Sequence, residues 1–387
     1  MRYVRSTVLV LVVVLAALVT AAFAFRGDAS SARSETTAAR RRVADTIRPR
    51  LHERWRVPIA ADVVGLPATD QAGVVVTAGN AQVVAVSRVG KLDWTTRLDG
   101  VVANAPRIDH DRVFVAADRV VAALDRGSGR VLWSTPTTTT DDDNRANRPV
   151  VADDIVVVTT AKGLVLGLDA TTGAERWRKV LPTELSSEPA LGRLAGESPV
   201  VAVVGLAEWW GLDPHSGATL WSGDLGIFGT SSPVVYADGD TLVAVVASDE
   251  HLFAVDARTG AQRWSTRAEQ SELFQVPVIA ANGNELLVPD HWGRLTAYRP
   301  SDGKRMWSAQ GDATAAEFGE PVWLGERFVA LPLDAHGPRL ASPRGAFRLR
   351  PPSDGFGIAD LPLGGLVVTT ASENRRNYVL LYDVSYD

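Results

Sequence analysis

The chain of 387 residues contains no cysteine, and this absence excludes several kinds of chemistry at once. Disulfide bonds, thiolate nucleophiles and Cys-ligated zinc or iron–sulfur sites are all ruled out. A lipid attached through an N-terminal cysteine is ruled out as well. Charged residues make up only 22% of the chain and hydrophobic residues 46%, so a sizeable core is expected and global disorder is not.

Catalytic and metal-binding motifs are also scarce. The chain has only six histidines, and none of them forms a pair with metal-ligand spacing. No Ser-His-Asp order, phosphate-cradling glycine loop or paired-carboxylate motif stands out. The acidic run Asp141, Asp142 and Asp143 offers the hard oxygen ligands that calcium prefers. Adjacent residues rarely converge on one ion, so we interpret the run as a solvated loop, with a calcium site as the alternative.

One long hydrophobic run lies near the N-terminus. Residues 8–25 contain no charge and only Thr20 is polar, while Arg2 and Arg5 precede the run. This length is at the lower edge of a membrane-spanning helix and above a typical signal-peptide core. We therefore expect residues 1–25 to be an uncleaved signal-anchor with the rest of the chain outside the cytoplasm. A secreted protein, cleaved near Ala24, is the alternative.

Charge is distributed unevenly along the chain. Residues 1–56 hold 11 Arg against 4 acidic residues, and residues 57–387 carry a net charge of about −12. We interpret residues 26–53 as an Arg-rich juxtamembrane linker, which either contacts anionic lipid headgroups or is simply solvated. The acidic remainder argues against nucleic acid as a partner.

A ten-residue pattern dominates the remaining sequence. LDATTGAERW (168–177) recurs with small changes as LDRGSGRVLW (124–133), LDPHSGATLW (212–221) and VDARTGAQRW (255–264). Asp starts a turn by accepting backbone N–H groups, Gly supplies a positive φ, and Trp lies on the strand that follows. Including more divergent copies, the repeated tryptophans are Trp55, Trp94, Trp133, Trp177, Trp221, Trp264 and Trp307.

Each repeat of about 42 residues also contains Val- and Ile-rich runs that predict four strands. Repeated four-stranded units are typical of a β-propeller. The last unit, 358–384, provides only three such runs, and the missing strand is found at the other end of the domain as RWRVPI (54–59). We therefore predict an all-β, eight-bladed propeller of antiparallel blades over residues 54–387, preceded by the transmembrane helix and the basic linker.

The repeated LD-x-x-[ST]-G-x-x-x-W motif resembles the pyrroloquinoline-quinone (PQQ)-type propeller family. That family includes quinoprotein dehydrogenases and the outer-membrane assembly lipoprotein BamB. The chain lacks both the vicinal cysteines common in the alcohol-oxidising enzymes and the lipidated cysteine of the lipoprotein. The resemblance to BamB is the stronger one, and it implies a scaffold that binds an envelope protein or peptide, without catalysis and without a cofactor. The alternatives are a small oxidoreductase with PQQ and calcium in the central funnel, or a ligand-sensing module.

Aromatic residues recur in the connections on one predicted face of the propeller. Either each ring is buried in its own blade, or the rings form an exposed patch for a partner. The candidates for such a patch are Trp209, Phe228, Phe274, Trp292, Phe318 and Phe356.

Overall fold

The structure is a computed structural model. It describes residues 49–386 except for 101–103, 119, 138–144, 186, 227–230, 249, 269–273, 281–282, 291, 293, 311–321, 325–327, 332–338, 343–344, 349–356, 362–364 and 370–376. The predicted anchor (1–25) and most of the predicted linker therefore lie outside the described residues. Within the described ranges, no helix is both long and apolar enough to span a membrane.

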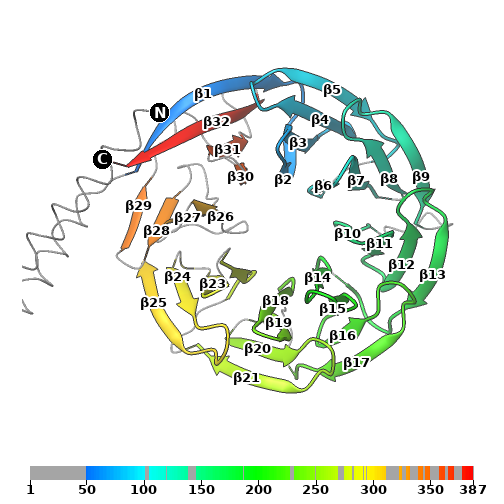
Figure 1. Ribbon diagram of the computed structural model, residues 1–387, viewed down its shortest axis with the longest axis vertical. Coiled ribbons are helices and arrows are strands. Elements are labelled where there is room, and N and C mark those ends of the chain that lie inside the picture. The colour runs from blue at the N-terminus through cyan, green and yellow to red at the C-terminus, as the bar shows by residue number, and fades with distance from the viewer. Residues whose placement is uncertain are drawn as a thin grey trace, which may run out of the picture. The chain divides into compact units, whose positions relative to one another are not determined.

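The described residues form strands that pair into four-stranded antiparallel sheets, so the predicted all-β class is confirmed. Figure 1 shows the sheets of Arg50–Ser385 standing side by side, with β2 and β6 on the inside and β5 and β9 on the outside. The innermost strands are β2 (Val63–Thr69), β6 (Arg107–Asp109), β10 (Val150–Ala152), β14 (Ala190–Gly192), β18 (Val234–Asp238), β22 (Val278–Ile279), β26 (Val322–Leu324) and β30 (Gly357–Leu361).

The two middle strands of each sheet follow in chain order. The second strands are β3 (Gly73–Ala78), β7 (Arg112–Ala116), β11 (Ile155–Thr159), β15 (Val200–Val204), β19 (Thr241–Ala247), β23 (Leu286–Pro289), β27 (Phe328–Leu331) and β31 (Gly365–Thr369). The third strands are β4 (Gln82–Ser87), β8 (Val120–Asp125), β12 (Leu164–Asp169), β16 (Glu208–Leu212), β20 (His251–Asp256), β24 (Arg294–Tyr298), β28 (Arg339–Ser342) and β32 (Asn377–Tyr386).

The outermost strands carry the repeated tryptophans, except for β29, which has none. They are β5 (Leu92–Arg97), β9 (Val131–Pro136), β13 (Glu175–Val180), β17 (Thr219–Asp224), β21 (Gln262–Arg267), β25 (Arg305–Gln310), β29 (Gly345–Arg348) and β1 (Pro49–Ile59).

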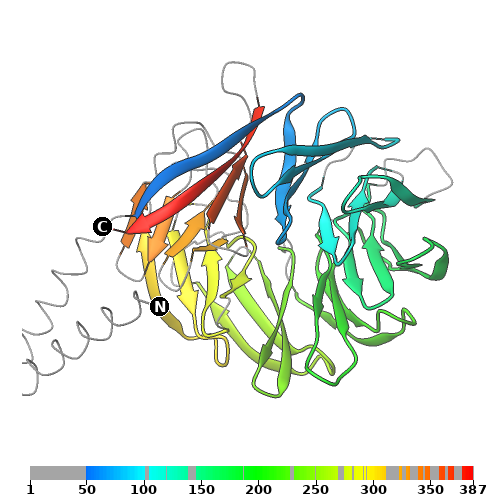
Figure 2. The same ribbon diagram turned by 45° about the horizontal axis from the view of Figure 1, so that its top comes forward.

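The first and last strands of the chain belong to one sheet. Its strand order is β1-β32-β31-β30, and Figure 2 shows β1 (blue) beside β32 (red). The prediction that residues 54–59 complete the last sheet is therefore confirmed. Val57 and Ile59 pack with Val379 and Leu381 in one core cluster, so apolar burial, as well as backbone pairing, joins the two ends of the domain.

Burial follows the position of a strand within its sheet. The second strand β11 is buried at every residue, because neighbouring sheets cover both of its faces. In the outer strand β9, Trp133 is the one buried residue, and the others are exposed or half-buried. The core therefore lies between adjacent sheets, and one cluster joins Val75 and Ala85 of one sheet to Val113 and Leu124 of the next.

Candidate functional site

The repeated tryptophans join each sheet to the next one. Trp94 on β5 donates its indole N–H to the carbonyl oxygen of Arg126 at 3.0 Å, and Arg126 lies in the β8–β9 turn of the neighbouring sheet. Corresponding bonds to the next sheet run from Trp55 to Arg88, Trp133 to Ala170, Trp177 to Pro214, Trp221 to Ala257 and Trp264 to Pro300. The repeated motif is therefore a structural contact between blades and not a catalytic one.

The glycine of the motif makes this contact possible. Gly129 has φ +70, and a Cβ atom there would lie 2.5 Å from the Trp94 ring. Asp125 organises the same turn by accepting the backbone N–H of Ser128 at 2.8 Å. The Ser128 hydroxyl, followed by its N–H, holds the pKa of Asp125 below its usual value. Asp, Gly and Trp of the motif thus serve a single purpose across two sheets.

Trp307 departs from this pattern. Its indole N–H is bonded to the Glu285 carboxylate at 3.0 Å, in the hairpin that begins its own sheet. Trp307, like Trp55 and Trp177, is partly exposed, whereas Trp94 and the remaining repeated tryptophans are buried.

Two of the predicted patch residues are buried, and for them the expectation of an exposed ring is wrong. Trp209 is 3% exposed because it lies within β16, where it packs edge-on against Trp221 at 5.1 Å between ring centroids. Phe274 is 7% exposed and packs edge-on against Tyr298 at 6.1 Å. Both rings fill gaps next to the sheets and cannot belong to a surface patch.

Trp292 is the patch candidate that the structure places on the surface, with 52% of the residue exposed. Its backbone N–H donates to the buried Asp290 carboxylate at 2.8 Å. The other patch candidates, Phe228, Phe318 and Phe356, lie outside the described residues, as do the calcium candidates Asp141, Asp142 and Asp143. In the part of the chain that is described, no three His, Cys, Asp or Glu side chains gather as metal ligands would.

Polar side chains at the starts of the innermost strands link neighbouring sheets. Asn104, just before β6, donates its side-chain amide to the carbonyl of Ala146, just before β10. Asn147 donates its amide to the Thr159 hydroxyl at 3.0 Å and to the Ser187 carbonyl at 3.1 Å, just before β14. The hydrogen bonds of these amides hold neighbouring sheets together, in the region where the funnel of a propeller opens.

Arg148 spans three sheets at the same level. Its guanidinium donates to the Pro106 carbonyl of the preceding sheet at 3.5 Å and lies 3.9 Å from the Glu188 carboxylate of the following sheet. Both distances are long, so the contact is a weak electrostatic bridge across the rim.

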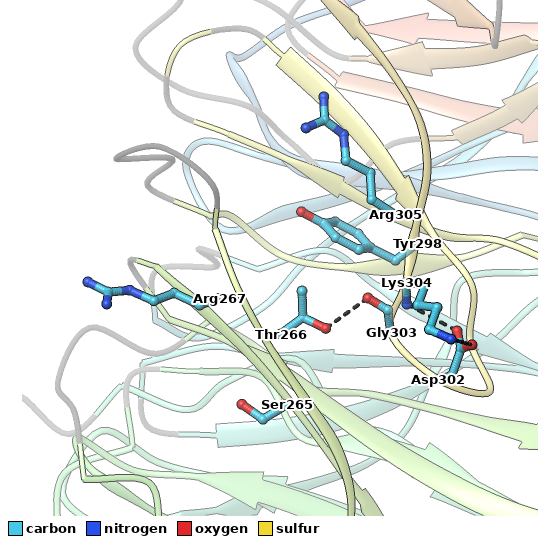
Figure 3. Close-up of a pocket in the computed structure, with 8 residues that line it drawn as sticks. All are labelled: Ser265, Thr266, Arg267, Tyr298, Asp302, Gly303, Lys304 and Arg305. Carbon is cyan, nitrogen blue, oxygen red and sulfur yellow. Dashed lines mark hydrogen bonds and ion pairs between the residues drawn. The ribbon is translucent and has the colours of Figure 1, made fainter.

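A groove of about 540 Å³ opens between the outer strand β21 and the β24–β25 turn of the next sheet (Figure 3). This volume is in the range of about 300–1,000 Å³ that is usual for ligand sites. The residues that line the groove are Ser265, Thr266, Arg267, Tyr298, Asp302, Gly303, Lys304 and Arg305.

Three cationic side chains and a single carboxylate set the charge of the groove lining. Thr266 closes its floor by donating its hydroxyl to the Gly303 carbonyl at 2.8 Å, which Figure 3 shows as a dashed line. The backbone N–H of Lys304, followed by the Arg299 guanidinium, holds the pKa of Asp302 below its usual value. Because three of the lining side chains are cationic and one is a carboxylate, the arrangement suits the binding of an anion.

The sequence holds a signal for this groove that the repeat pattern obscured. Three positions of the repeat can be compared at each junction between two sheets. Two of them are the first and second residues after the motif glycine, and the third lies three residues after the motif tryptophan of the preceding repeat. At the groove these positions hold Lys304, Arg305 and Arg267. The same three positions at the other described junctions hold Lys91, Leu92 and Pro58; Arg130, Val131 and Arg97; Ala174, Glu175 and Pro136; Ala218, Thr219 and Val180; and Ala261, Gln262 and Asp224.

Comparisons with known proteins agree with this architecture. The family model described as outer membrane protein assembly factor BamB matches residues 49–205 and 183–331. The crystal structure of BamB from Moraxella catarrhalis is 16% identical, with a TM-score of 0.67 over 86% of this chain and 99% of that chain. The computationally designed protein Ika8 is 15% identical, with a TM-score of 0.65 over 84% of this chain and 97% of that one.

An enzyme has the same fold. The quinohemoprotein alcohol dehydrogenase ADHIIG from Pseudomonas putida HK5 is 11% identical, with a TM-score of 0.66 over 86% of this chain and 76% of that chain. Likeness at such low identity establishes the fold alone. Comparison with curated proteins finds no significant match.

Proposed function

Because this chain belongs to the family of the outer membrane protein assembly factor BamB, we propose that it is a scaffold that binds an envelope protein or peptide, without catalysis. The observation that carries this proposal is the family match across residues 49–331. The role of the polar rim in joining sheets supports it, because Asn104 and Asn147 are used for structure. Fold likeness alone would not separate a scaffold from an enzyme.

The proposed architecture is an eight-bladed propeller closed by its N-terminal strand. The described strands make eight four-stranded sheets, and β1 completes the last of them. The innermost strands β2 and β30 are in contact, which brings the first and last sheets together. A closed arrangement protects the edge strands of both terminal sheets and leaves its loop faces available to a partner.

The proposed location is the extracytoplasmic side of the membrane, with residues 8–25 as an uncleaved anchor and residues 26–53 as the linker. Support comes from the charge-free apolar run and the arginines on both sides of it. The test is N-terminal sequencing of the membrane fraction. A mature chain that begins at Met1 or Arg2 supports the anchor, and one that begins at Phe25 overturns it.

Binding of a calcium-bound quinone fits the described residues poorly. Calcium takes six to eight oxygen ligands, and among the described residues no three His, Cys, Asp or Glu side chains are placed to hold a metal ion. The side-chain amides of Asn104 and Asn147 are committed to bonds between sheets. The direct test is to add PQQ and Ca²⁺ to the purified chain and to measure chromophore binding and dye-linked turnover. Stoichiometric binding with turnover would replace the scaffold proposal with an oxidoreductase.

The scaffold proposal is tested by cross-linking in the cell that makes the protein. A photoreactive residue replaces the exposed Trp292, and a matched variant carries it at Val89, which is 81% exposed and lies in the β4–β5 turn. We expect a partner to be captured from position 292, and the purified partner to bind the full chain saturably with a Kd below about 10 µM. If every product forms equally from both positions, or if none binds saturably afterwards, the proposal is wrong.

A further inference from the structure

The groove beside β21 has more cationic residues at the three compared positions than any of the other junctions compared. Arg267, Lys304 and Arg305 supply cations at all three of the positions compared above. The junction next to β5 has cations at two of them, Arg97 and Arg130. Since residues 57–387 are acidic as a whole, this cationic cluster is a local exception to the surrounding charge.

Two cations of the groove, Arg267 and Lys304, are held only loosely by the protein, while Arg305 donates to the Ser308 hydroxyl at 2.6 Å. Arg267 lies 3.0 Å from Glu250, and the Arg267 side chain is 71% exposed. Lys304 lies 3.5 Å from Asp302, and the Lys304 side chain is 75% exposed. Ion pairs this exposed contribute little, so an incoming carboxylate can compete for both cations. Figure 3 shows Arg267 and Arg305 extending from two different strands, with Tyr298 beside Arg305.

The groove also runs along a strand edge. β21 is the last strand in the sheet order β18-β19-β20-β21, and among the described strands none pairs with its outer edge. Ser265 and Arg267 are exposed on this strand, and Thr266 between them is half-buried. An extended segment can add to such an edge through backbone hydrogen bonds, and every second side chain then points to the same side.

We propose that this groove binds an extended acidic peptide segment, which pairs with the edge of β21 and places its carboxylates against Arg267, Lys304 and Arg305. The proposal rests on the proposed function and assigns a chemistry to the partner. Charge complementarity and an open edge select this occupant, because a carboxylate can form paired hydrogen bonds with a guanidinium while the backbone satisfies the strand.

The test uses the full chain in detergent and a fluorescein-labelled ten-residue peptide that alternates Glu with Thr. A peptide with Lys in place of every Glu is the control for charge, and one with alternate N-methylated backbone amides is the control for strand pairing. We expect saturable binding of the Glu peptide by fluorescence anisotropy, weakened by added salt. Each control peptide should bind at least tenfold more weakly.

The protein variants localise the binding. Arg267→Glu with Lys304→Glu should weaken the Glu peptide at least tenfold and leave the melting temperature unchanged, because both side chains are largely exposed. Arg97→Glu with Arg130→Glu makes the same change in net charge at another junction and should have less than a twofold effect. Equal weakening by the two pairs would mean that net charge alone attracts the peptide, and the groove proposal would be wrong.

The remaining outcomes distinguish failure of the groove proposal from failure of the scaffold proposal. If the Glu peptide does not bind, or if the Lys peptide binds as well, the groove proposal fails, while a partner captured by cross-linking would still uphold the scaffold. If N-methylation has no effect, pairing with β21 is refuted. Peptide binding without any captured partner would leave the groove in place and overturn the proposed function.

Discussion

The contact between Gly129 and Trp94 allows the bond between two blades to be tested with a single methyl group. In Gly129→Ala the new Cβ atom would lie 2.5 Å from the Trp94 ring and 2.7 Å from the Thr96 hydroxyl oxygen. Thr96 itself donates that hydroxyl to the Gly129 carbonyl at 2.6 Å, so it has little freedom to move away. Either the turn or the outer strand β5 must shift.

Two costs add at this position. A left-handed backbone costs a residue with a Cβ roughly 1–2 kcal/mol relative to glycine, and Gly129 has φ +70. Forcing a methyl group into a filled contact costs about 1–3 kcal/mol more. We therefore expect Gly129→Ala to lower the free energy of unfolding by about 2–5 kcal/mol.

Gly239→Ala is the matched control, because Gly239 has φ +63 and no atom lies within 4 Å of a Cβ placed there. Only the backbone cost applies, so we expect a loss of about 1–2 kcal/mol. The entropy that alanine removes from the unfolded chain is common to both variants and cancels in their difference. The difference between the two substitutions therefore measures the contact with the Trp94 ring.

The assay is urea unfolding of the purified protein, followed by circular dichroism. A third variant, Gly129→Ala with Trp94→Ala, removes the ring that the methyl group meets. Its loss should fall short of the sum of the two single losses by about 1–3 kcal/mol, because the collision is gone. Equal losses in Gly129→Ala and Gly239→Ala, or strict additivity in the double variant, would refute the proposed contact between blades.

Three further changes test other parts of the structure. Removing residues 50–59 should lower the melting temperature more than any single core substitution, because it exposes a whole sheet edge; an unchanged melting temperature would contradict closure by β1. Trp209→Ala should cost about 3–5 kcal/mol and Trp292→Ala almost nothing, because the first is 3% exposed and the second 52%; similar losses in urea unfolding would contradict this difference. Burial of Asp70 acts to raise its pKa, but the hydrogen bonds and charge of Arg126, together with the backbone N–H groups of Gly73 and Ala72, outweigh burial and the pKa is lowered. Its stabilisation is complete above its unfolded pKa of about 3.9 and is lost as pH falls through the lower folded value. Asp70→Asn should therefore flatten the fall in melting temperature below pH 4, and an unchanged acid limb would show that the ion pair has no such role.

The strand content and the joining of the chain ends could be predicted from the sequence because both depend on local patterns. A turn that needs Asp and Gly at fixed offsets, followed by an apolar run, defines a strand boundary without knowledge of its neighbours. The last repeat lacked a strand, and residues 54–59 supplied one. In the structure these residues lie in β1, which pairs with β32.

The aromatic patch could not be predicted in the same way. Trp209 and Phe274 occur near connections in the sequence, and position along the chain says nothing about which way a ring turns. Trp209 is buried because Trp221, on the next strand of the same sheet, offers an aromatic edge at 5.1 Å. Trp292, by contrast, is exposed as its place among the patch candidates predicted, and its backbone N–H donates to the carboxylate of Asp290.

By itself, the sequence determined that this protein repeats a four-stranded unit and uses its first strand to complete its last sheet, because hydrogen-bonding turns and apolar runs are local properties. Only the tertiary structure decided that the glycine of one repeat lies under the tryptophan of the repeat before it, 35 residues earlier in the case of Gly129 and Trp94. The same holds for Arg267 and Lys304, which share a groove although 37 residues separate them. Such contacts arise when separate sheets pack against each other, and that packing brings together side chains from different repeats.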